Sequence, residues 1–203
     1  MEALTNLKNR YWLLILPVLL FLTRYYYHFG LRIPALERAG REHPMTFQSF
    51  LVFNYLLGVI LMFLFLFFNF LLLKGISYLW QNLESKKLLK AILISYCVFF
   101  IPGIISSLYF TLFNADFQSG ELGAFDRAFY LKAETSMDDP FASNTMDSIL
   151  LSVSLMEFAY FAVMVVALQF LFEDLSMKKI VPIVLILACV HFGSKTIIPL
   201  MMA

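Results

Sequence analysis

The chain alternates between long apolar stretches and polar segments. A helix needs roughly 20 mostly apolar residues to cross the hydrocarbon of a bilayer. Stretches that meet this requirement lie at residues 11–29, 48–73, 88–113, 148–172 and 180–203. The pattern predicts an all-α fold: a polytopic membrane helix bundle with about five transmembrane helices, forming a single integral membrane domain over residues 1–203.

The first stretch has the shortest uninterrupted apolar run, because Arg24 follows directly after Thr23. Residues 25–29 are rich in aromatic side chains, as in the belt at a membrane surface, and an Arg side chain can extend toward such a belt. We therefore expect Arg24 near the outer end of this helix. The mixed apolar and charged residues 34–42 favour a short helix that lies on the lipid headgroups.

The Lys and Arg residues near the stretches favour a cytoplasmic N-terminus and an outer C-terminus, since this orientation places more of them inside. The acidic segment 114–147 then forms an outer loop. Asp138, Asp139 and Asp147 of this loop lack the alternating ligands and central glycine of an EF-hand. We therefore expect this loop to be solvated and to hold no metal ion. For the whole protein we expect a location in a bacterial inner membrane.

The composition agrees with a membrane location, since 61% of the residues are hydrophobic and only 14% are charged. A soluble domain of this size could not cover so much apolar surface. The net charge of +1 gives no basic field for nucleic acid. The expected partners are membrane lipids and other membrane protein subunits.

The familiar catalytic motifs for zinc proteases, serine hydrolases, phosphate loops and CxxC redox sites do not occur in the sequence. Cys189 and His191 are two residues apart on a predicted helix, so they point about 200° apart and do not form a nucleophile and base. We expect no enzymatic activity and no cofactor. A membrane enzyme is the least favoured of three possible functions, after an organising subunit and a transporter or ion-conducting subunit.

Ionisable residues inside the apolar stretches provide the best functional clue. Glu157 lies within residues 148–172, and His191 and Lys195 lie within residues 180–203. Such groups are costly in hydrocarbon, so they face the bundle interior and pair.

With a rise of about 1.5 Å per residue, Glu157 and Lys195 fall at one depth on consecutive antiparallel helices, which predicts an ion pair. Arg24 lies at a similar depth as a competing partner, and Asn54 can complete the polar cluster.

This cluster allows two interpretations. Polar contacts between membrane helices fix their register, at about 1 kcal/mol per hydrogen bond. Intramembrane carboxylate and imidazole groups are also the usual parts of a proton or ion path. A helix break favours a transporter, and Pro102 with Gly103 is the candidate break, although such a pair more often marks a packing kink.

Three stretches of the sequence contribute to a pattern of polar turn, basic helix start and proline. They are residues 10–17 (RYWLLILP), residues 86–96 (KKLLKAILISY) leading to Pro102, and residues 173–179 (EDLSMKK). Together they resemble the Yip-domain family of five-span membrane proteins. The resemblance implies a cytoplasmic N-terminus, an outer C-terminus and no catalytic residue set. Eukaryotic members act in vesicle trafficking and membrane shaping through partner proteins. Only about ten residues precede the first stretch here, which leaves no cytosolic tail for small GTPases and argues against a trafficking role.

The sequence therefore favours a non-enzymatic accessory or organising subunit of a larger membrane assembly. The alternative is a small transporter or an ion- or proton-conducting subunit that uses Glu157, His191 and Lys195.

The predicted orientation can be tested by cysteine labelling in intact cells. A Ser136→Cys variant should be modified by an impermeant reagent because residue 136 lies in the expected outer loop, whereas Ser85→Cys should be spared. Labelling at both positions, or at Ser85→Cys alone, would contradict the orientation.

Overall fold

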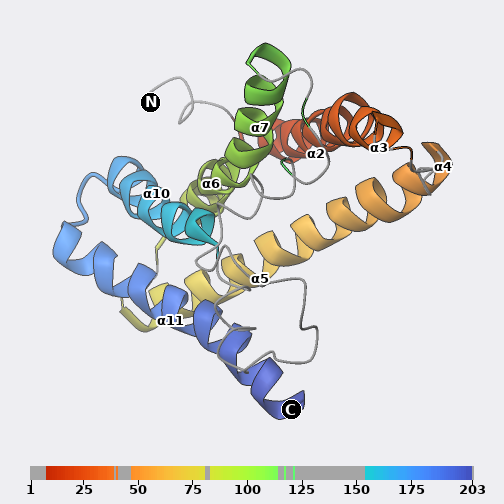
Figure 1. Cartoon of the computed structure of the whole chain (residues 1–203). Helices are drawn as coiled ribbons and strands as arrows, with labels where there is room; N and C mark the ends of the chain where they lie inside the picture. The colour runs from red at the N-terminus through yellow and green to blue at the C-terminus, as the bar shows by residue number, and fades with distance from the viewer. Residues whose placement is uncertain are drawn as a thin grey trace. The chain divides into compact units, whose positions relative to one another are not determined.

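The regular elements in the described part of the chain are helical, which confirms the all-α prediction (Figure 1). The structure is a computed structural model, and it describes residues 8–38, 40, 47–80, 83–113, 117, 121 and 154–202. The acidic segment 114–147 lies outside the described residues except for Phe117 and Glu121, so its predicted role as a solvated loop stays a prediction.

The first helix is longer than its apolar stretch. It begins as α2 (Asn9–Tyr25), continues through the π-helical segment η1 (Tyr26–Arg32) and ends with α3 (Ile33–Arg38). The N–H of Ile33 donates to the carbonyl of His28, five residues back. The widened π turns come directly before Pro34, which has no N–H and crowds the preceding turn of a regular helix.

Two sequence expectations about this region are therefore wrong. Arg24 lies near the middle of the continuous helix Asn9–Arg38 and not at its end. The short surface helix expected over residues 34–42 is, as far as Arg38, the last part of this same helix. Gly40 beyond it has a positive φ of 66°, a conformation that glycine adopts without steric cost.

The remaining helices follow the predicted stretches. They are α4 (Phe47–Ser49), η2 (Phe50–Leu56) and α5 (Leu57–Trp80), then α6 (Ser85–Tyr96), η3 (Cys97–Phe100) and α7 (Ile101–Leu112), and finally α10 (Leu155–Leu171) and α11 (Met177–Met202). The segment η3 is a 3₁₀ helix that interrupts the third stretch just before Pro102. The helix Ser85–Leu112 continues through this segment, so at the candidate break the structure has a local tightening, next to the turn that the Pro ring disturbs.

Among the residues that the structure describes, four helices are long and apolar enough to cross a membrane, which suggests a multi-pass integral membrane protein. They are Asn9–Arg38, Phe50–Leu79, Ser85–Leu112 and Met177–Lys195. The fourth expected stretch, 148–172, contains the shorter apolar helix α10 of 17 residues. At about 1.5 Å per residue this helix is about 25 Å long, slightly less than the hydrocarbon thickness of about 30 Å.

The chain divides into two compact units, Met1–Phe68 with Phe99–Asp126, and Asn69–Val98 with Arg127–Ala203. The single domain expected from the sequence stays a prediction. In the first unit, Leu31, Ala35, Phe110 and Phe117 form a buried cluster against which Tyr27 packs.

A second cluster of the first unit surrounds the buried ring of Phe50. His28 stacks on it with ring centroids 5.3 Å apart, and Tyr25 and Phe29 meet it edge to face. These aromatic contacts hold η1 against η2. The residues expected to form a membrane-surface belt therefore also pack inside the protein.

The second unit is organised around α10, which packs against both α6 and α11 (Figure 1). The buried residues of α10 recur every three or four positions, as expected for a helix with one face in a core. They are Glu157, Tyr160, Phe161, Met164, Ala167 and Leu168. This packing fixes the face on which Glu157 projects.

The role of this face can be tested with neighbouring substitutions on α10. Ala167 is buried, whereas Val166 is exposed. Ala167→Leu should lower the free energy of unfolding by about 1–3 kcal/mol, because added methylene groups overpack a filled core. The control Val166→Leu should have little effect on thermal unfolding in detergent. Equal effects of the two variants would contradict the packing described for α10.

Candidate functional site

The carboxylate of Glu157 is the centre of the candidate site, and its position is set by the start of α10. Ser154 precedes the helix in an extended conformation, and its Oγ accepts a hydrogen bond from the N–H of Met156 at 3.1 Å. The N–H of Ser154 donates to Oε2 of Glu157 at 3.0 Å. Ser154 and Glu157 thus form a capping box, in which two side chains satisfy N–H groups that the helix itself leaves without acceptors.

This capping box corrects one part of the sequence interpretation. Glu157 was expected inside a helix that covers residues 148–172, but α10 begins at Leu155 and places Glu157 in its first turn. The signal was present in the sequence, because Ser154-Leu-Met-Glu157 has the S-x-x-E pattern of a capping box. Because the residues around this motif are apolar, hydropathy alone predicted a continuous transmembrane helix.

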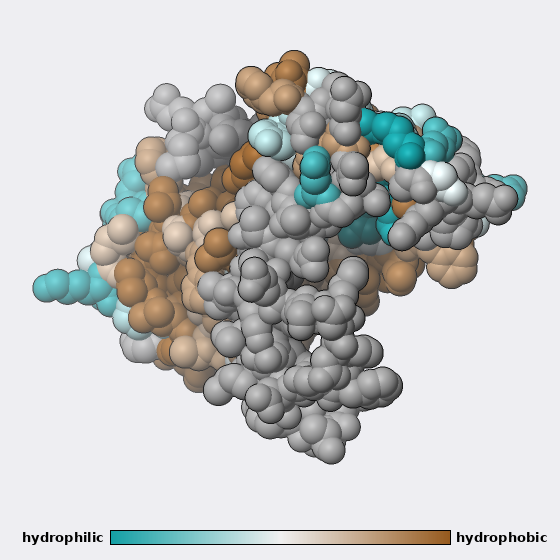
Figure 2. Space-filling view, in the orientation of Figure 1, coloured by the Kyte–Doolittle hydropathy of each residue, from teal (hydrophilic) through white to brown (hydrophobic). Residues whose placement is uncertain are grey.

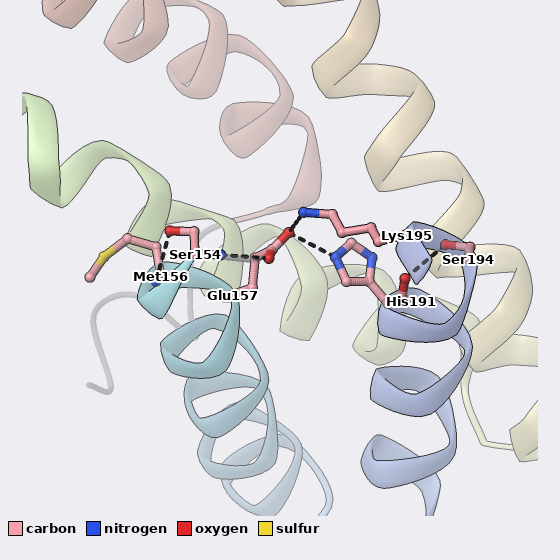
Figure 3. Close-up of polar contacts among 6 residues, drawn as sticks. All are labelled: Ser154, Met156, Glu157, His191, Ser194 and Lys195. Carbon is pink, nitrogen blue, oxygen red and sulfur yellow. Dashed lines mark hydrogen bonds and ion pairs between the residues drawn. The ribbon is translucent and has the colours of Figure 1, made fainter. Parts of the chain in front are cut away.

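The other carboxylate oxygen, Oε1, connects α10 to α11 (Figure 3). It lies 2.9 Å from Nε2 of His191 and accepts a hydrogen bond from Nζ of Lys195. His191 and Lys195 are four residues apart on α11, so they lie on the same face one turn apart. One carboxylate therefore joins the first turn of α10 to two successive turns of α11.

The site is largely shielded from solvent. The exposed fraction of the side chain is 8% for Glu157, 12% for His191 and 29% for Lys195. An ion pair in such surroundings attracts more strongly than one in water, and the cost of dehydrating the charges is offset only if their hydrogen bonds are satisfied. Glu157 meets this condition with acceptor contacts at both oxygens, and the positive end of the α10 dipole favours its charge.

Aromatic rings surround the polar contact on both helices. Phe161 of α10 lies 5.6 Å from the ring of His191, and Phe158 stacks on Phe192 at 4.9 Å between centroids. Ser194 Oγ donates to the backbone carbonyl of His191 at 2.7 Å. These ring contacts pack α10 against α11 beside the carboxylate.

The predicted contact between Glu157 and Lys195 is present, and His191 joins them. Arg24 belongs to the other compact unit, where a Cβ atom at Gly58 would lie 3.0 Å from its Cζ atom. Its role as a competing partner of Glu157 stays a prediction. The side chain of Asn54 lies outside the described residues, as do Asp138, Asp139 and Asp147.

The described residues contain no group of three or more His, Cys, Asp or Glu residues that could hold a metal ion. Chemically, the Glu157 cluster can fix the relation of two helices or pass a proton between a carboxylate, an imidazole and an amine. No protein-family model, curated protein or solved structure matches the chain. The resemblance to the Yip-domain family therefore stays a prediction.

The contact with α11 can be separated from the capping of α10 by substitution at Glu157. Glu157→Gln keeps a side chain suited to the capping box but removes the charge that pairs with Lys195. Breaking a buried pair costs about 3–5 kcal/mol, so Glu157→Gln and Lys195→Met should each destabilise the protein, and the double variant should cost less than their sum.

The measurement is thermal unfolding in detergent over the complete double-mutant cycle. Ser194→Ala provides a control on the same helix, because Ser194 bonds only to a backbone carbonyl of its own helix in the contacts described above. A coupling energy near zero between positions 157 and 195 would show that the pair contributes nothing to stability.

Proposed function

We propose that the protein is a non-enzymatic integral membrane accessory or organising subunit of a larger membrane assembly. The observation that carries this proposal is that both oxygens of the Glu157 carboxylate are engaged within the chain. One oxygen accepts from the start of its own helix, and the other contacts His191 and Lys195 of the next helix. A carboxylate whose two oxygens are both engaged by its own chain stabilises a helix arrangement.

The exposed face of α5 supports the same proposal. Large apolar side chains are exposed along a broad face of this helix, among them Ile60, Leu61, Leu64, Phe67, Phe68 and Leu71. Figure 2 shows further broad hydrophobic areas on the described surface. In a bilayer such faces contact acyl chains or the helices of partner subunits, where packing and polar contacts drive association.

An ion- or proton-conducting subunit is the second candidate. The observation in its favour is that three titratable side chains lie in contact. Lys195 is the most exposed of them, with 29% of its side chain accessible. A conducting role would require the contact between Glu157 and Lys195 to open during each cycle. The capping bond from Ser154 and the surrounding rings oppose such opening, so we rank this function second.

The two functions predict different behaviour of the purified protein. An organising subunit should leave its membrane in gentle detergent with stoichiometric partner chains, and it should elute as a species larger than a detergent-bound monomer. In proteoliposomes that contain this chain alone, a pH gradient should decay as slowly as in empty vesicles.

Proteoliposomes with Glu157→Gln provide the matched comparison for the flux experiment. Fast decay with the natural chain that returns to the empty-vesicle rate in Glu157→Gln would establish the conducting function. Elution as a lone chain from native membranes would overturn the organising function.

A further inference from the structure

The turn between α10 and α11 forms a pocket that the proposed function does not use. It has a volume of about 310 Å³ and is lined by Lys87 of α6 and by Leu171, Phe172, Glu173, Asp174 and Leu175 of the turn. All of these residues belong to the second compact unit. The buried side chain of Leu175 and the hydrogen bond from its N–H to the carbonyl of Phe172, at 3.0 Å, give the turn a defined shape.

The pocket carries charges of both signs. The ammonium group of Lys87 lies 5.4 Å from the centroid of the Phe172 ring and 4.0 Å from a carboxylate oxygen of Glu84. Glu173 and Asp174, both exposed, provide two carboxylates. A ligand that complements these groups has an anionic part for the lysine and a cationic part for the carboxylates.

The pocket also lies where apolar helices begin and end. The apolar helix α10 ends at Leu171, and the candidate membrane spans Ser85–Leu112 and Met177–Lys195 begin beside the pocket. Figure 2 shows hydrophilic residues at the left edge of the view, next to a hydrophobic area, where Figure 1 places the turn. A pocket at the polar end of membrane helices lies at the level of the lipid headgroups.

From these observations we infer that the pocket binds the headgroup of phosphatidylethanolamine. The phosphate pairs with the ammonium group of Lys87, and the primary ammonium of ethanolamine donates hydrogen bonds to Glu173 and Asp174. Choline has the same charge but no N–H to donate, and the anionic headgroup of phosphatidylglycerol meets two carboxylates without offering a cation. The pocket therefore favours the ethanolamine headgroup over the choline and glycerol headgroups.

This inference goes beyond the proposed function and does not depend on it, because it requires no partner subunit. The test measures lipid binding to the full chain in detergent by native mass spectrometry, with lipids of identical acyl chains. Phosphatidylcholine should bind about tenfold more weakly than phosphatidylethanolamine, since a lost hydrogen bond to a charged group costs about that much in affinity. Soluble phosphoethanolamine should compete with the lipid because the pocket contacts only the headgroup.

Variants connect the selectivity to individual side chains. The double variant Glu173→Gln, Asp174→Asn should bind phosphatidylethanolamine no better than phosphatidylcholine, and Lys87→Gln should weaken the binding of both. The control Glu37→Gln removes an exposed carboxylate from the first compact unit and should leave selectivity unchanged. Unchanged thermal unfolding would show that these exposed residues can be replaced without loss of the fold.

The inference is overturned by equal binding of the two lipids to the natural chain, by a preference for phosphatidylglycerol, or by selectivity that survives the double carboxylate variant. Failure of soluble phosphoethanolamine to compete would place recognition on the acyl chains and would also overturn it. None of these outcomes bears on whether the protein assembles with partner subunits.

Discussion

The arrangement of the second compact unit depends on one carboxylate that contacts two helices at once. Glu157 accepts a hydrogen bond from the N–H of Ser154 with one oxygen and contacts His191 and Lys195 with the other. The capping contact defines where α10 begins, and the cross-helix contact defines which face of α11 it meets. A side chain that performs both tasks couples the formation of a helix to its packing. Loss of the contact with α11 would also leave a charge buried in an apolar environment, where it is costly.

The two compact units accommodate their intramembrane charges in different ways. In the second unit, the negative charge of Glu157 is balanced by Lys195 on the neighbouring helix. In the first unit, the guanidinium group of Arg24 lies against the backbone at Gly58, where an added Cβ atom would be 3.0 Å from Cζ and from a guanidinium nitrogen. Glycine leaves room there for a wide, planar cation between two helices. Glu157 is buried and paired, whereas Arg24 is exposed and lies against a neighbouring helix at a glycine.

The sequence predicted the helical class and the approximate spans because apolar length is a direct consequence of the bilayer. It also predicted the contact between Glu157 and Lys195, because depth along antiparallel helices depends only on the rise per residue. It did not predict that the first helix continues past residue 29, since the π-helical turns before Pro34 leave no trace in hydropathy. The start of α10 was misplaced because hydropathy outweighed the capping pattern at Ser154. Local hydrogen bonding, and not apolar length, determined both of these boundaries.

The capping box also affects the choice between a structural and a conducting role. A carboxylate that carries protons must exchange its partners, and each exchange at Glu157 would disturb either the first turn of α10 or the contact with α11. The ring of Phe161 beside His191 and the stacked pair Phe158 and Phe192 restrict the side-chain movements that an exchange needs. Because the same group holds two helices, proton transfer through it would be coupled to helix movement. A path of that kind would be slow and gated, whereas a fixed contact needs no such coupling, so the observed geometry favours a stable helix arrangement over conduction.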